Sequence, residues 1–194
     1  GRNPHRRANL STGEYSKEPI NSTILGAAKF SGKTQNGWSI GLLESVTSNE
    51  YTEIREVNGE TRKEIVEPLT NFIVTRAQKD FNERNSFIGG IFTATNRNLD
   101  GNFSELHKAA YTGGLDFQHN WKNREFYFQG NVIMSHVLGS KEAITETQQT
   151  LRHNFGRVDA GHVSIDPNKT SLTGTGGRIE IGKQGGGNWR YDGG

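Results

Sequence analysis

The sequence predicts an all-β fold: an antiparallel up-and-down meander that is part of a transmembrane outer-membrane β-barrel, with short periplasmic turns and long external loops. Three observations predict it. Eight segments alternate between apolar and polar side chains, the two central segments are each about 14 residues long, and short and long connections alternate. The expected strands are 23–31, 37–49, 69–81, 85–97, 108–121, 124–138, 171–184 and a strand beginning at 188–192.

The central pair of segments, 108–121 and 124–138, has the clearest alternation. A two-residue turn at Lys122-Asn123 would pair Trp121 with Arg124 and place Phe117 opposite Phe128. Such strands far exceed the usual length of roughly 5–6 residues, and one apolar and one polar face suit a wall between lipid and water. The side chains expected to face lipid are Tyr111, Leu115, Phe117, Phe128, Val132 and Met134.

The opposite face of the predicted sheet is mainly polar, although the hairpin of segments 69–81 and 85–97 also places Phe72, Val74, Phe87 and Ile91 on it. In a barrel wide enough to hold water, this face would line the lumen. Two interpretations remain open: these residues solvate and cross-pair the interior wall, or some of them select a solute. The residues expected to face the lumen are Arg76, Asp80, Asp116, Gln118, Gln129, Asn131, Arg178 and Glu180.

The connections between the expected strands alternate in length. Segments 31–36, 82–84, 122–123 and 185–187 are short, whereas 50–68, 98–107 and 139–170 are longer. Membrane barrels have this asymmetry, with short periplasmic turns and longer external loops. A soluble meander has no reason to keep it.

The three tryptophans lie beside the short connections. Trp38 and Trp121 flank tight turns, and Trp189 lies two residues after Gly187. Indole rings favour the membrane–water interface, so these residues are expected to form an interface girdle, with Lys79 snorkelling to the same level. Ordinary packing at strand ends is the alternative.

Composition excludes several classes of site. The chain lacks cysteine, so it has no disulfide and no thiolate site. Its net charge of +2 does not indicate nucleic acid as a partner. The six histidines form no H-x-H or H-E-x-x-H pattern, and Gly-x-Ser-x-Gly is absent. We therefore expect no metal, no cofactor and no enzymatic activity.

The chain opens with Gly1 rather than an initiator methionine, and it has no apolar run near the ~20 residues of a membrane helix. We interpret residues 1–194 as a single segment, of about seven or eight strands, from a larger barrel domain. On this interpretation, an N-terminal module and the remaining strands are absent.

Several stretches resemble a known family: GRNP at 1–4, ILGAAKF at 24–30 with GWSIG at 37–41, EPLTNF at 67–72 with KDF at 79–81, AYTGGLDF at 110–117 and GKQGGGNWR at 182–190. This family comprises large Gram-negative outer-membrane proteins. They carry an N-terminal module similar to family-9 carbohydrate-binding modules and a C-terminal domain of unknown function that is expected to form a β-barrel. The resemblance covers most of the chain.

The resemblance implies a location in the cell outer membrane. The implied partners are membrane lipid and the remaining strands of the same barrel, with a glycan or other outer-membrane proteins as further candidates. The expected function is a structural wall or pore that contributes to binding or passage of a glycan-related solute. No catalytic residues carry over from the family.

Two alternatives predict different surroundings for the apolar face. A soluble β-sandwich carbohydrate-binding module would bury it against a second sheet. Part of a carbohydrate-active hydrolase would need two carboxylates facing each other across a cleft. The seven glutamates between positions 44 and 67 are expected to lie in a solvated loop instead.

Overall fold

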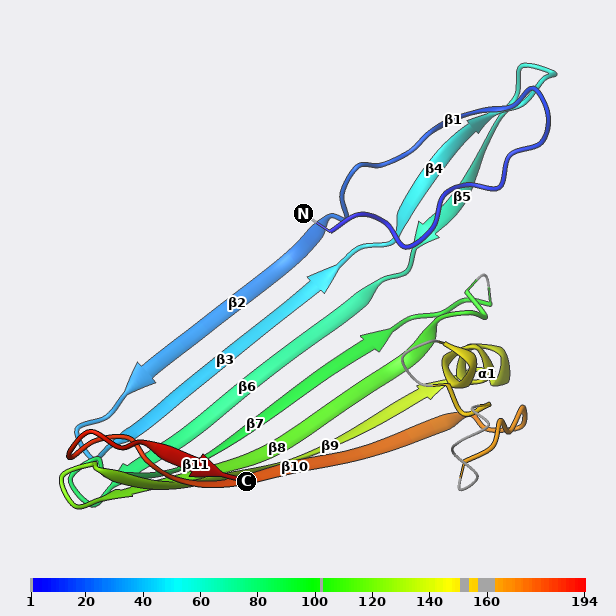
Figure 1. Cartoon of the computed structure of the whole chain (residues 1–194). Coiled ribbons are helices and arrows are strands. Elements are labelled where there is room, and N and C mark those ends of the chain that lie inside the picture. Colours follow the sequence, from blue (N-terminus) through cyan, green and yellow to red (C-terminus); the bar gives the residue numbers. More distant parts are fainter. Residues whose placement is uncertain (1, 102, 151–153, 157–162) are drawn as a thin grey trace.

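The computed structural model describes residues 2–101, 103–150, 154–156 and 163–194. The fold is all-β, with two antiparallel sheets and, within those residues, one short helix (Figure 1). The larger sheet has eight strands in the order β11-β10-β9-β8-β7-β6-β3-β2, and the smaller has three in the order β1-β4-β5. Neighbours in the large sheet follow one another along the chain, apart from the β4–β5 insertion. The predicted up-and-down meander is confirmed.

All eight predicted strands of the large sheet are present, and their bounds agree with the prediction to within three residues. They are β2 (Ile24–Lys33), β3 (Trp38–Thr47), β6 (Thr70–Phe81), β7 (Ser86–Arg97), β8 (His107–Trp121), β9 (Phe126–Gly139), β10 (Ser171–Lys183) and β11 (Tyr191–Gly193). Over the described residues the sheet is open, because β2 and β11 form its two edges. These residues form no closed barrel, so the predicted place of the chain in a larger transmembrane barrel stays a prediction.

The pairing of β8 with β9 differs from the prediction by two residues. Trp121 pairs with Phe126 rather than with Arg124, because residues 122–125 form a four-residue turn. Lys122, Asn123 and Arg124 all adopt positive φ, at 53°, 55° and 64°, and the Glu125 N–H donates to the Lys122 carbonyl. The turn thus has four residues, three of them in the left-handed conformation, whereas the sequence pattern predicted a turn of two residues.

This change of register leaves every side chain on its predicted face, because the side-chain period of a strand is two. Phe117 is now opposite Gly130, and Phe128 is opposite His119. The rings of Phe117 and Phe128 still approach to 6.1 Å between centroids. The β6–β7 turn has the same form, with positive φ at 82–84, and there the predicted pairing of Phe81 with Ser86 is confirmed.

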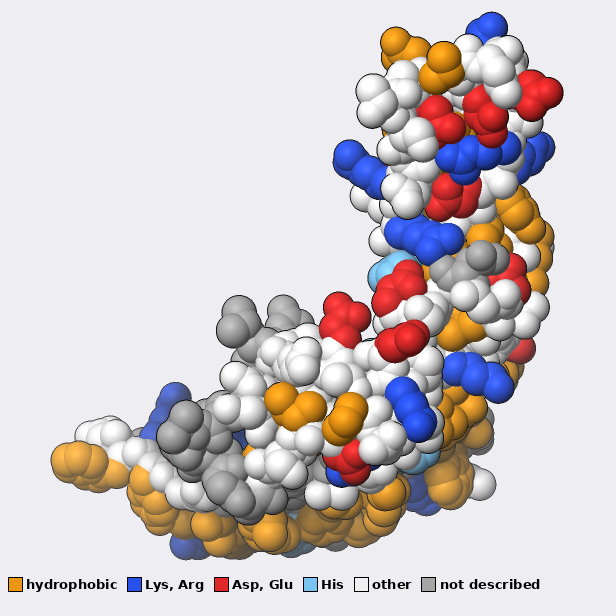
Figure 2. Space-filling view, turned by 90° about the vertical axis from the view of Figure 1, so that its right-hand side faces the viewer, with side chains coloured by type: hydrophobic (Ala, Val, Ile, Leu, Met, Phe, Trp, Pro, Cys, Tyr) orange, Lys and Arg blue, Asp and Glu red, His pale blue; other side chains and the backbone are white. Residues whose placement is uncertain are grey.

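The tight connections of the large sheet lie together at one end of the strands, and the longer ones lie at the other (Figure 1). We call these the turn end and the loop end. The sheet is strongly curved, and hydrophobic side chains gather along the outer, convex side of the curve (Figure 2). The alternating connection lengths therefore correspond to two chemically different ends.

The loop end contains structure that the sequence pattern did not reveal. β1 (Tyr15–Lys17), β4 (Glu50–Arg55) and β5 (Thr61–Glu67) form the small sheet, and α1 (Lys141–Gln149) follows β9. The glutamate-rich stretch was expected to be a solvated loop, and this was wrong. Thr52 and Ile54 are fully buried on one face of β4, whereas the other face carries the exposed residues Tyr51, Glu53 and Arg55. The Ser140 hydroxyl caps α1 by accepting the Ala143 N–H at 3.0 Å.

A compact apolar cluster lies at the loop end. Ile65, Phe103 and Leu106 are buried there, with Leu99 packed against them. The Arg6 guanidinium lies 4.5 Å from the centroid of the Phe103 ring, and the Arg6 N–H donates to the Val66 carbonyl at 3.2 Å. The N-terminal segment is thereby held along β5. In contrast, the middle of the large sheet has no comparable buried cluster among the described residues.

Candidate functional site

The two faces of the large sheet form the candidate site. Register places all six residues predicted to face lipid on one face, which we call the apolar face. Leu115, Val132 and Met134 are 60%, 54% and 56% exposed. The described chain therefore leaves the middle of this face uncovered.

The aromatic residues of this face contact aromatic neighbours on adjacent strands. Tyr111 stacks on Phe92 from β7 at 6.5 Å, and its hydroxyl donates to the Asn96 side chain at 2.7 Å. Phe117 and Phe128 are half-buried and contact each other. These contacts run along the surface and do not enclose the rings in a core.

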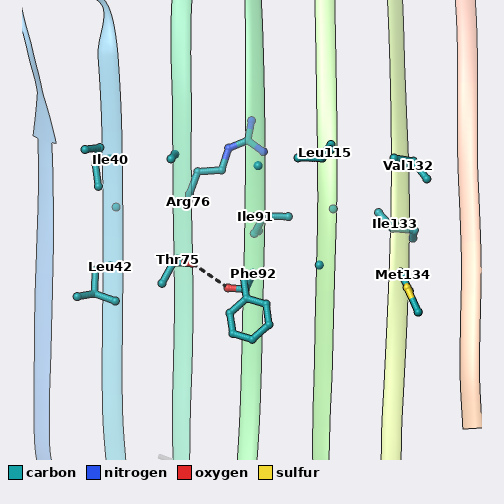
Figure 3. A pocket seen from close by; sticks show the side chains of 15 residues that line it. Ile40, Leu42, Thr75, Arg76, Ile91, Phe92, Leu115, Val132, Ile133 and Met134 are labelled. Atoms are coloured by element: carbon teal, nitrogen blue, oxygen red, sulfur yellow. Dashed lines mark hydrogen bonds between the residues drawn. The ribbon is translucent and has the colours of Figure 1, made fainter.

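A hollow of about 730 Å³ crosses β3, β6, β7, β8 and β9 near mid-strand (Figure 3). Glycines at 41, 90, 113 and 114 contribute to its lining. A Cβ at Gly90 would meet the Leu115 side chain at 3.3 Å, and one at Gly114 would meet Ile133 at 3.0 Å. Large side chains thus lie over glycines on the neighbouring strands. Arg76 is the single charged residue of the lining.

The eight residues predicted to face the lumen all lie on the opposite, polar face. Two rungs of the sheet align most of them. Asp116 is opposite Asn131, which is opposite Arg178, and Gln118 is opposite Gln129, which is opposite Glu180. The eight residues therefore share one face of the sheet, whereas the contacts that they make within it were not predicted.

A bidentate ion pair on the polar face joins Arg76 and Asp116. The guanidinium donates to both carboxylate oxygens, at 2.5 and 2.7 Å. The two residues belong to β6 and β8, so the pair spans the intervening strand β7 at Gly89. A Cβ there would lie 2.6 Å from Arg76 Nη2 and 2.8 Å from Asp116 Oδ1. Gly89 is therefore a site residue that the sequence analysis missed, since its only role is to leave space.

A second ion pair extends this network toward the turn end. Lys33 Nζ lies 3.0 Å from Asp80 Oδ2, which links β2 to β6 across β3. The Gln78 side chain donates to Asp80 at 2.9 Å and accepts from Arg76 at 3.2 Å. Lys33 was not predicted, although its position in the alternation of β2 could have indicated it.

The third network involves Tyr127, Arg178 and Glu180 on β9 and β10. The Tyr127 hydroxyl donates to Glu180 Oε1, and Arg178 Nη2 lies 2.5 Å from Glu180 Oε2. Tyr127 lies over Gly182, where a Cβ would approach its ring within 2.7 Å. A polar cavity of about 420 Å³ adjoins Tyr127, with Gln118, Gln129 and Asp192 in its lining.

Each acid of the three networks is thus matched by a neighbouring donor. Asp116 has Arg76, Asp80 has Lys33, and Glu180 has Arg178. Paired charges and amides suit a hydrated, cross-linked surface. A hydrolytic acid–base pair would need two carboxylates placed for separate proton transfers.

The predicted interface tryptophans lie toward the turn end. Lys79 Nζ lies 5.6 Å from the Trp38 ring centroid, and Trp121 stacks on Phe126 at 5.7 Å. Trp189, in the connection between β10 and β11, is 82% exposed.

The described residues lack two further features. Residues 2–101, 103–150, 154–156 and 163–194 contain no cluster of three or more histidine, aspartate or glutamate side chains suited to a metal ion. Over the same part of the chain, no helix has the length and apolar character needed to cross a membrane.

The fold and the two faces define a class of protein: an antiparallel β-meander, curved and chemically two-sided. Residues 1–192 match the family model described as Domain of unknown function (DUF5916), so the chain belongs to that family. Neither the curated proteins nor the solved structures contained a match.

Proposed function

We propose that this chain forms part of the wall of an outer-membrane β-barrel in a Gram-negative bacterium, with the apolar face toward lipid and the polar face toward a water-filled lumen. The exposure of Leu115, Val132 and Met134, each above half, is the observation that carries the proposal. Uncovered apolar side chains in the middle of long antiparallel strands need an apolar surrounding, and hydrocarbon supplies it.

The height of the apolar face supports this assignment. On β7, the apolar face runs from Ser86 to Asn96, with Ile88, Phe92 and Ala94 between these polar ends. Ten residues at about 3.3 Å each span about 33 Å along the strand. At a strand tilt of about 40° that becomes about 25 Å, the height of the apolar band in membrane barrels.

The edges of the sheet support a role as one part of a closed wall. The outer edges of β2 and β11 have no strand beside them among the described residues. Free edges present unpaired N–H and C=O groups, which are costly in hydrocarbon and are removed when a barrel closes. We propose that remaining strands of the same barrel pair with these edges.

The polar face supports the proposal that the lumen holds a hydrophilic solute. Arg76–Asp116 and Lys33–Asp80 are each paired across an intervening strand, and the side chain of Gln118 contributes to the lining of a polar cavity. A glycan-related solute is the class that the family resemblance implies, together with an N-terminal module similar to family-9 carbohydrate-binding modules. The loops at the other end would then face the cell exterior.

Two adjacent residues of β9 provide the sharpest test. Val132 is 54% exposed on the apolar face, and Ile133 is 48% exposed on the polar face. Arginine at a lipid-facing midplane position destabilises a barrel by about 2–4 kcal/mol, whereas a lumen position tolerates it. We expect Val132→Arg to show that loss and Ile133→Arg to show little, in urea unfolding of the vesicle-inserted protein followed by tryptophan fluorescence.

Equal losses from the two arginines would contradict the proposal, because both faces would then have the same surroundings. A larger loss from Ile133→Arg would reverse the assignment of the faces. A protein that stays dispersed without detergent, with Val132 shielded from aqueous quenchers, would favour the β-sandwich alternative.

A further inference from the structure

We propose that the turn end of the apolar face binds the phosphate groups of an anionic phospholipid layer through three lysines, Lys79, Lys122 and Lys183. This inference rests on the proposed function, since it names the lipid chemistry that one rim of the wall meets. Three features support it: the aromatic rings beneath these lysines, the lysines' lack of carboxylate partners among the described residues, and their position on the strands.

Two of the lysines lie over one aromatic stack. Phe126 stacks on Trp121 with an angle of 16° between ring planes, and Trp121 stacks on His119 at 5.8 Å. Lys122 Nζ lies 5.4 Å from the centroid of the Phe126 ring, and Lys183 Nζ lies 5.8 Å from it. A single ring is therefore in cation–π range of two ammonium groups, both of which are attracted to its π-electrons.

Lys79 forms a second aromatic contact further along the rim. It is directly opposite Trp38 in the pairing of β3 with β6. Its ammonium lies 5.6 Å from the Trp38 ring centroid and donates to the Asn36 carbonyl. The indole ring and the turn backbone hold the charge at the end of the strand, where a long side chain can snorkel to a polar headgroup.

The lysines at this end differ by face in their ionic partners. On the polar face, Lys33 is paired with Asp80 at 3.0 Å. Within the described part of the chain, no carboxylate lies within ion-pair distance of Lys79, Lys122 or Lys183. The uncompensated charge is therefore directed outward, to the side where we propose lipid, and its complement is an anion.

The position of the three lysines matches a headgroup layer. Lys79, Lys122 and Lys183 belong to the last rungs or turns of their strands, and the next rungs inward carry Phe128 and Ile181. Basic residues also outnumber acidic ones at the turn end. Segments 33–38, 79–86, 121–126 and 183–192 contain Lys33, Lys79, Arg84, Lys122, Arg124, Lys183 and Arg190 against Asp80, Glu83, Glu125 and Asp192.

The test compares two kinds of vesicle. One is pure phosphatidylcholine, and the other contains two parts phosphatidylcholine to one part phosphatidylglycerol. Partitioning of the chain is measured by tryptophan fluorescence. A basic residue near an anionic surface contributes roughly fivefold in partitioning. Because three lysines together contribute about 100-fold, we expect the wild type to prefer the anionic vesicles by about that factor at low salt. In about 1 M NaCl, where the Debye length is ~3 Å, most of this preference should disappear.

The variant K79Q/K122Q/K183Q should lose most of the preference and still partition into phosphatidylcholine. The control variant K17Q/K29Q/K141Q loses the same charge elsewhere and should keep the preference for anionic vesicles.

Unchanged preference in K79Q/K122Q/K183Q, or equal losses in the two variants, would overturn this inference while leaving the proposed function intact. Failure of the wild type to enter either vesicle would instead overturn the proposed function, and this inference with it. Suppression of the preference by free inorganic phosphate at low concentration would show a soluble anion, not a lipid, as the ligand.

Discussion

The Arg76–Asp116 pair connects the predicted polar face with a measurable free energy. Its two residues are 40 positions apart in sequence and belong to strands separated by β7, so the contact exists only when β6, β7 and β8 are in register. The perturbation is a double-mutant cycle with Arg76→Ala, Asp116→Ala and both together. The cycle isolates the pair from whatever each truncation does alone.

The expected coupling follows from geometry and exposure. Arg76 and Asp116 are 36% and 26% exposed, and two charge-assisted bonds of 2.5 and 2.7 Å join them. Exposed pairs contribute about 0.2–1 kcal/mol. Hydrogen bonds to charged groups contribute about 1.5–3 kcal/mol where water is largely excluded. A bidentate pair that is partly screened falls between these ranges, so we expect a coupling of about 1 kcal/mol.

The assay is urea unfolding of the four proteins in vesicles, with the free energy of unfolding taken from the transition. Lys63 and Glu53 provide a matched control cycle on the small sheet, because they form a single contact of 3.5 Å and are 64% and 50% exposed. That pair should couple by about 0.2 kcal/mol. Gly89→Ala should reproduce part of the Arg76–Asp116 effect, since its Cβ would lie 2.6 Å from Nη2.

A coupling no larger than that of the control pair would refute the reasoning. It would mean that water screens the polar face as fully as it screens the small sheet, and that the bidentate geometry adds nothing. A positive coupling that persists unchanged at high salt would instead indicate that the pair is shielded more than its exposure implies.

Two further predictions concern single contacts. Gly182→Ala should displace the Tyr127 ring and change the near-UV circular dichroism of the protein, whereas Gly176→Ala, whose Cβ would meet a side chain at 3.5 Å, should not; identical spectra would contradict the packing. The Ser11 N–H bonds the Glu14 carboxylate at 2.8 Å and, with a neighbouring arginine, lowers the pKa of Glu14. Because the pKa of Glu14 is lower in the folded protein, its carboxylate stabilises the N-terminal turn at any pH above the ordinary glutamate pKa of about 4.3. This stabilisation is lost as the pH falls through the pKa of Glu14 in the folded protein. Nuclear magnetic resonance should show the Ser11 amide shift titrating below about pH 4.3 and no such step in Glu14→Gln.

The strands of the large sheet were predictable because alternation is a local property. Side chains at 111, 115 and 117 share a face because side chains alternate with a period of two along any strand. A pairing error of two residues therefore leaves each side chain on the same face. The length of the turn between β8 and β9 was predicted wrongly, because the residue types of Lys122-Asn123-Arg124 do not indicate three consecutive left-handed conformations. For the turn of the same form between β6 and β7, the pairing of Phe81 with Ser86 was predicted correctly.

The small sheet and the helix were missed for a different reason. Six glutamates lie in or beside β4 and β5, at 50, 53, 56, 60, 64 and 67, and their density suggested a solvated loop. The structure buries one side of this hairpin, where Ile54 and Val66 are almost inaccessible. Glu67 is buried too, and Arg2 and the His5 N–H compensate its charge. Those partners come from a segment more than 60 residues away, which no local pattern could have indicated.

The sequence by itself determined the strand order, the two faces and the difference between the two ends, because each depends on side-chain period or connection length along a short stretch. Only the tertiary structure decided which charges meet. Arg76 reaches Asp116, and Lys33 reaches Asp80, across a strand that lies between them. Such contacts need three strands in register and a small residue, such as Gly89, at the crossing point, and that is a property of the assembled sheet.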